Sequence, residues 1–84
     1  METLIGTVTH YYNRISVAVV DLSAELKVGD TVLILGHTTD FTQEVTSLEI
    51  EHHKVRSAGP SGEVAVKIDE EVRRGDLVYK VQAE

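Results

Sequence analysis

The sequence is dominated by short apolar runs with a period of two. In GEVAVKI, for example, Val64, Val66 and Ile68 share one face of an extended strand, whereas Ala65 and Lys67 share the other. No window of about a dozen residues keeps the spacing of an amphipathic helix. The pattern therefore predicts an all-β, antiparallel domain whose strands bury one face each.

Seven strands are predicted, and they cover residues 4–11, 15–20, 31–35, 42–50, 53–57, 63–68 and 77–81. A glycine followed by an acidic residue introduces three of them, at Gly29, Gly62 and Gly75, where a tight turn needs a positive φ. With no helix to cover a flat sheet, short strands must pack as a sandwich or close on themselves. Closure removes exposed edges, so we predict one small closed β-barrel of six to seven strands over residues 1–84.

Composition excludes several classes of protein. The chain has no cysteine, which rules out disulfides, thiolate catalysis and cysteine zinc sites. No apolar run approaches a membrane span and the N-terminus lacks a signal-peptide pattern, so a soluble, cytoplasmic protein without membrane contact is expected. The net charge of −6 argues against strong, nonspecific binding of polyanions. It leaves room for local basic patches at Lys54 with Arg56 and at Arg73 with Arg74.

Three groups of residues contain side chains or turns that are typical of chemical sites. His52 and His53 are adjacent, and in an extended strand they would point to opposite faces, so no metal site is assigned. No serine lies in a Gly-x-Ser-x-Gly elbow, so no catalytic residue is assigned and the chain is predicted not to be an enzyme. The AGPSG loop, residues 58–62, either directs backbone amides at an anion or is an ordinary turn, and turn chemistry is favoured.

The pair Tyr11 and Tyr12 has two interpretations. Alternation directs one ring into the core and leaves the other on the surface. A surface ring beside Arg14 is suited to stack on a nucleic-acid base, although a merely exposed tyrosine is the simpler account. Phe41 is expected to begin a strand as a core anchor.

Four segments together resemble domain 2 of the translation elongation factors of the Tu and 1A type. They are IGTVTHYY from Ile5, LKVGDTVLI from Leu26, VTSLEIEHHKVRSAGPSGEVAVKI from Val45 and VRRGDLVYKV from Val72. The resemblance covers nearly the whole chain and implies a closed, Greek-key-like antiparallel barrel that normally lies beside a GTP-binding domain. The chain itself has no Gly-x-x-x-x-Gly-Lys-Ser/Thr loop, so GTP binding by this chain alone is not expected.

The resemblance also implies a function. In elongation factor Tu this barrel helps to hold the aminoacylated 3′ end of tRNA, and in other members it contacts the ribosome. The glutamate of that pocket matches Glu49, whereas Glu51 stands where the family commonly has a histidine. A non-enzymatic module without a cofactor is expected, binding tRNA, rRNA, the ribosome or a translation-related protein. The predicted contact residues are Tyr12, Arg14, Glu49, His52, Lys54, Arg56, Arg73 and Arg74.

A second hypothesis competes with this one. Similar barrels with comparable KVGD and RxGD turns are appended to collagenase-like peptidases, and a fold hosts more than one function. The chain is then a protein-interaction or structural accessory domain. A small hydrolase or metalloprotein is a third, less favoured alternative.

Overall fold

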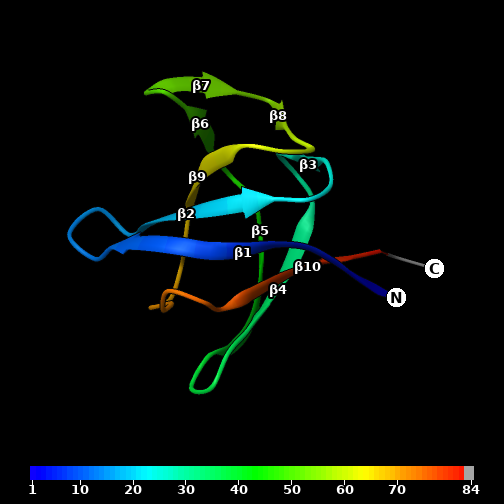
Figure 1. Cartoon of the computed structure of the whole chain (residues 1–84), viewed down its shortest axis with the longest axis vertical. Helices are drawn as coiled ribbons and strands as arrows, with labels where there is room; N and C mark the ends of the chain where they lie inside the picture. Colours follow the sequence, from blue (N-terminus) through cyan, green and yellow to red (C-terminus); the bar gives the residue numbers. More distant parts are fainter. Residues whose placement is uncertain (83–84) are drawn as a thin grey trace.

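The computed structural model describes residues 1–82, which form ten strands and no helix (Figure 1). The strands are β1 (Glu2–Tyr12), β2 (Val17–Leu22), β3 (Leu26–Lys27), β4 (Thr31–Leu35), β5 (Asp40–Glu44), β6 (Leu48–Ile50), β7 (His53–Val55), β8 (Ser57–Ala58), β9 (Glu63–Lys67) and β10 (Leu77–Val81). Eight of them form one antiparallel sheet in the order β5-β4-β10-β1-β2-β9-β6-β7. The short strands β3 and β8 pair separately. Nowhere in residues 1–82 is there a helix with the length and apolarity to cross a membrane.

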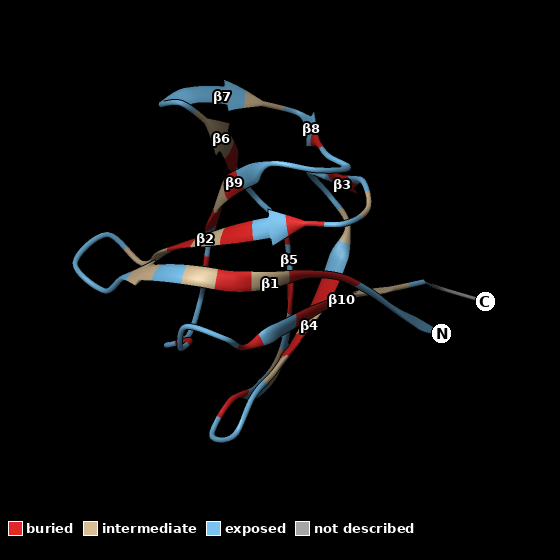
Figure 2. Ribbon diagram, in the orientation of Figure 1, coloured by how far each residue is buried: buried red, intermediate tan, exposed pale blue. Residues whose placement is uncertain are grey.

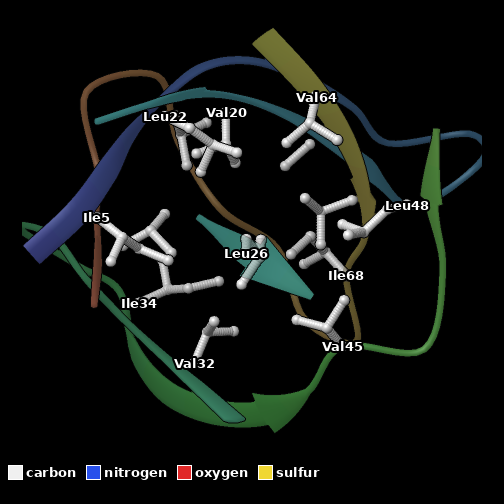
Figure 3. Packing of buried hydrophobic residues seen from close by; sticks show 14 of the residues in the cluster. Ile5, Val20, Leu22, Leu26, Val32, Ile34, Val45, Leu48, Val64 and Ile68 are labelled. Carbon is white, nitrogen blue, oxygen red and sulfur yellow. The ribbon is translucent and has the colours of Figure 1, made fainter. Parts of the chain in front are cut away.

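The sheet curls around one hydrophobic core. Figure 3 shows buried aliphatic side chains from strands far apart in the sequence pointing toward a common centre, with Leu26 in the middle of the group. Valine, isoleucine and leucine provide almost all of the core, because branched side chains pack well on a pleated surface. Tyr11 and Phe41 are partly buried against this core, as alternation predicts, while Tyr12 is exposed.

The prediction that the barrel is closed is wrong. The eight-stranded sheet ends at β5 and β7, and these two strands do not pair in the described residues. A buried side chain instead joins β5 to the end of β9: Gln43 Nε2 donates to the Lys67 carbonyl at 2.9 Å, and Gln43 Oε1 accepts from the Asp69 amide at 2.7 Å. The all-β, antiparallel part of the prediction is confirmed.

Two predicted strands divide in the structure and one strand, β3, was not predicted, so ten strands replace seven. The predicted strand 42–50 becomes β5 and β6, because β5 pairs with β4 whereas β6 pairs with β9, on the other side of the sheet. The predicted strand 53–57 becomes β7 and β8. The strands predicted at residues 31–35 and 77–81 match β4 and β10.

Strand β2 shows which of its two apolar faces is inside. The core receives Ala18, Val20 and Leu22, so Val17 and Val19 lie on the outer face and are only half-buried. Over residues 17–20 both sets are apolar, and only Asp21, near the end of the strand, distinguishes the outer face in the sequence. The outer set forms part of the groove described next.

Candidate functional site

The outer face of the sheet carries a groove of about 840 Å³ over β2, β9 and β6. The turn between β1 and β2 and the turn between β6 and β7 border it, and both are exposed on the left of the view in Figure 2. Its lining includes Tyr12, Ile15, Val17, Val19, Ser47, Glu49, Ile50, Glu51, His52, Glu63, Ala65 and Lys67. The groove therefore lies on the face of β2 and β9 that points away from the core.

A short side chain in the central strand explains why this face is hollow. Strand β9 runs between β2 and β6, and Ala65 pairs with Val19 on one side and with Glu49 on the other. Residues directly opposite on neighbouring antiparallel strands project from the same face. The alanine methyl group thus forms the floor, and the longer side chains of Val19 and Glu49 rise on either side of it.

The rim of the groove carries more negative than positive charge. Three carboxylates, Glu49, Glu51 and Glu63, face one lysine, Lys67. Glu63 Oε2 accepts a hydrogen bond from the Thr9 hydroxyl at 3.0 Å.

Two of these carboxylates are not engaged by the protein itself. Lys67 Nζ donates to the Ile15 carbonyl at 3.0 Å, which holds the β1–β2 turn against β9. Within residues 1–82 the ion pairs are Lys27 with Glu25 and Lys80 with Asp30, so neither Glu49 nor Glu51 forms an ion pair there, although Lys54 lies opposite Glu49 on β7. Glu49 is also half-buried.

The β6–β7 turn is conformationally strained. Ile50 pairs with His53, so the turn consists of two residues, Glu51 with φ 50° and His52 with φ 67°. A two-residue hairpin with positive φ at both positions favours Asn-Gly or Gly-Gly. Positive φ is less favourable for glutamate and histidine than for glycine or asparagine. Both residues line the groove. Strain of this kind often occurs where a side chain is needed for another purpose.

The structure brings together three of the eight predicted contact residues. Tyr12, Glu49 and His52 come from different strands and turns and all line the groove. Arg14 is exposed in the adjoining β1–β2 turn without lining the groove.

None of the other four predicted residues lines the groove, although Lys54 projects beside Glu49, its partner across β6 and β7. Lys54 and Arg56 line a separate, shallower hollow of about 220 Å³. Arg73 and Arg74 precede β10 in an exposed turn and line neither hollow.

The groove residues that were not predicted as contacts are Ile15, Val17, Val19, Ser47, Ile50, Glu51, Glu63, Val64, Ala65 and Lys67. The sequence contained part of the information needed to find them, because alternation in EVAVK places a small residue and a lysine on the outer face of one strand. Which strands lie on either side of β9 is a tertiary property.

The paired histidines lie in different elements. His52 belongs to the strained turn and His53 begins β7. Across residues 1–82 no three histidine, aspartate or glutamate side chains gather where they could hold a metal ion.

Comparison with known proteins gives related sequences. The sequence matches no model of a protein family. It is 45% identical over 76 residues to an uncharacterized protease of Methanocaldococcus jannaschii, covering 89% of this chain. It is 31% identical over 81 residues to a collagenase of Porphyromonas gingivalis, covering 94% of this chain. The matches span only 19% and 22% of those two relatives.

Solved structures with the same fold agree with these relatives. The C-terminal domain of a putative U32 peptidase from Geobacillus thermoleovorans superposes with a TM-score of 0.88 and 22% sequence identity, over 95% of this chain and 93% of that domain. Its selenomethionine variant superposes with a TM-score of 0.84.

The resemblance to elongation factor domain 2 is therefore wrong as an identification, and with it the assignment to translation, RNA binding and the ribosome. The KVGD and RRGD segments are strand entries, at Gly29 and Gly75, whose positive φ any β domain with such turns requires. They are not specific to one family. The chain has the fold of a U32 peptidase C-terminal domain, and its curated relatives are a protease and collagenases.

Proposed function

We propose that this chain acts as a non-catalytic accessory domain of the kind carried by collagenase-like and U32 peptidases, and that it binds protein. The observation that carries the proposal is the 45% identity to a segment that makes up 19% of a protease. A match that covers most of this chain and so little of the relative indicates a shared accessory segment. The fold shared with a U32 peptidase C-terminal domain supports the same proposal.

The lining of the groove suits recognition rather than bond cleavage. Glu63 and Lys67 are engaged in hydrogen bonds with their own chain. The buried carboxylate Asp76 accepts a bond from the Arg73 amide and thereby holds a turn. Apart from Ser47, Glu49, Glu51 and His52, the rest of the lining is aliphatic and aromatic surface, which is typical of a site that positions a partner.

A domain exchange tests the accessory role. The matching 76-residue segment of the Methanocaldococcus jannaschii protease is deleted in one variant and replaced by this chain in another. We expect the deletion to lower cleavage of gelatin more than cleavage of a short fluorogenic peptide, and the replacement to restore gelatin cleavage. Unfolding midpoints of both variants show whether the remaining protease stays folded.

Two results would contradict the proposal. A folded replacement variant that cleaves gelatin no better than the deletion variant argues against the accessory role. Hydrolysis of gelatin or of the short peptide by the purified 84-residue chain alone argues against a non-catalytic domain.

A further inference from the structure

We propose that the groove over β2, β9 and β6 binds an extended polypeptide segment in which a bulky apolar side chain lies next to lysine or arginine. This inference rests on the proposed protein-binding function and names the chemistry that the groove selects. The apolar side chain occupies the hollow above Ala65, and the neighbouring cation pairs with Glu49.

The size of the groove fits a binding site. Its volume of about 840 Å³ lies within the range of known ligand pockets, roughly 300–1,000 Å³. Two of the most exposed large apolar side chains in residues 1–82 lie at its border, Tyr12 at 51% and Ile15 at 58% exposed. Apolar surface gathered in one concave place, with a polar rim, is typical of an interaction site.

The width of the groove favours an extended segment over a helix. Strands β2 and β6 lie on either side of β9, so two strand spacings of about 4.8 Å separate them, roughly 10 Å in all. The side chains of Val19 and Glu49 narrow this opening further. An α-helix with its side chains is about 10–12 Å across and would not enter. A single side chain of an extended segment is narrow enough to enter the groove.

The charge of the rim selects a cationic occupant. Glu49 is half-buried, and Lys54, opposite it on β7, is exposed and forms no ion pair with it, so a lysine or arginine from the occupant gains a charge-assisted hydrogen bond in a partly desolvated place. Glu51 and Glu63 add negative charge, which repels acidic peptides and the phosphates of nucleic acids. A second copy of this chain, with its own net charge of −6, is disfavoured for the same reason.

The strained turn is a further sign that the rim is built for binding. Glu51 and His52 hold positive φ values at a place where Asn-Gly would be easier, and both side chains face the groove. The turn thereby keeps a carboxylate and an imidazole at the edge of the hollow.

Three labelled peptides test the chemistry, namely Leu-Lys-Leu-Lys, Leu-Glu-Leu-Glu and Ser-Lys-Ser-Lys, each flanked by Gly-Ser. Binding to the 84-residue chain is measured by fluorescence polarisation at low and high salt. We expect the Leu-Lys peptide to bind at least about tenfold more tightly than either of the others, and its affinity to fall as salt rises. Equal binding of the Leu-Glu peptide, or tighter binding of a single-stranded RNA oligonucleotide, overturns the proposal.

Two variants test the location. Glu49→Gln is expected to weaken binding of the Leu-Lys peptide about tenfold. The matched control Glu44→Gln, on the exposed face of β5, is expected to leave the affinity unchanged.

Ala65→Leu fills the hollow and is expected to abolish binding. Because that variant can also disturb folding, amide chemical-shift changes on titrating the unaltered chain provide a second readout. Shifts centred away from Val19, Glu49 and Ala65 overturn the location.

The outcomes separate this inference from the proposed function. Restored gelatin cleavage in the domain exchange, without selective peptide binding, leaves the accessory role standing and overturns the groove. Selective peptide binding without restored gelatin cleavage supports the groove as a peptide site and overturns the accessory role. Light scattering measures whether the chain forms a dimer. A dimer that dissociates in the Ala65→Leu variant would identify a second copy as the occupant of the groove and would overturn the proposal of a peptide ligand.

Discussion

At the scale of single residues, the loop between β4 and β5 is packed against a buried carboxylate. Asp76 is 5% exposed, and its Oδ2 accepts the Arg73 amide hydrogen at 2.8 Å. A Cβ atom added at Gly36 would lie 1.9 Å from Asp76 Oδ1. Glycine at position 36 thus allows the loop to lie directly on this side chain, an approach that the sequence pattern does not reveal.

Gly36→Ala is therefore expected to lower the free energy of unfolding by about 1–3 kcal/mol, because Asp76 must move from its hydrogen-bonded position. Urea denaturation followed by circular dichroism measures the change. Thr38→Ala, in the same loop but exposed, is the control and should shift stability by no more than about 0.5 kcal/mol. Equal stability of the two variants would mean that Asp76 adapts freely.

At the scale of elements, Gln43 links the edge strand β5 to the end of β9. Its amide makes two hydrogen bonds with main-chain groups of Lys67 and Asp69 and is 7% exposed. Gln43→Met keeps the length of the side chain and removes both bonds. The unfolding free energy should fall by about 1–3 kcal/mol, because a main-chain carbonyl and a main-chain amide at a partly buried place lose their partner.

Hydrogen exchange gives a direct measurement of this effect. The Asp69 amide should exchange faster in Gln43→Met by more than the global loss of stability explains. Thr42→Val, on the exposed face of the same strand, is the control. Unaltered protection at Asp69 would show that the main chain at this seam is held by other contacts.

The β6–β7 turn gives a prediction of opposite sign. Changing Glu51→Asn and His52→Gly together supplies the residues that a two-residue turn with positive φ favours. Thermal unfolding should show a gain in stability of about 0.5–2 kcal/mol. The same double variant should bind the Leu-Lys peptide less tightly, because Glu51 leaves the groove. A loss of stability would contradict the assignment of strain to this turn.

At the scale of the whole molecule, the curled sheet separates a core on its inner face from a groove on its outer face. Val19 and Val20 are neighbours in the chain and belong to different sides of this division. Val20→Ala should cost about 1.5–3 kcal/mol of unfolding free energy, since it leaves a cavity in the core. Val19→Ala should cost less than about 1 kcal/mol and yet weaken binding of the Leu-Lys peptide. The reverse order of stabilities would place Val19 in the core.

What the sequence by itself determined is local. The period of two predicted an all-β domain, and the Gly-acidic turns at Gly29, Gly62 and Gly75 adopt the positive φ that was expected of them. Strands β4 and β10 were predicted residue for residue, because each is a short, mainly apolar run that begins directly after a Gly-Asp turn.

Only the tertiary structure decided the rest. Val17 and Val19 on one face of β2 are as apolar as the residues on the other, so its orientation depends largely on which set of side chains the other strands cover. The open edges follow from β5 and β6 pairing with different partners. The groove needs Val19, Ala65 and Glu49 in one row, and these residues come from three separate segments of the chain. Alternation assigns a residue to a face of its own strand, but the register between strands, set by packing of the whole chain, determines which residues meet.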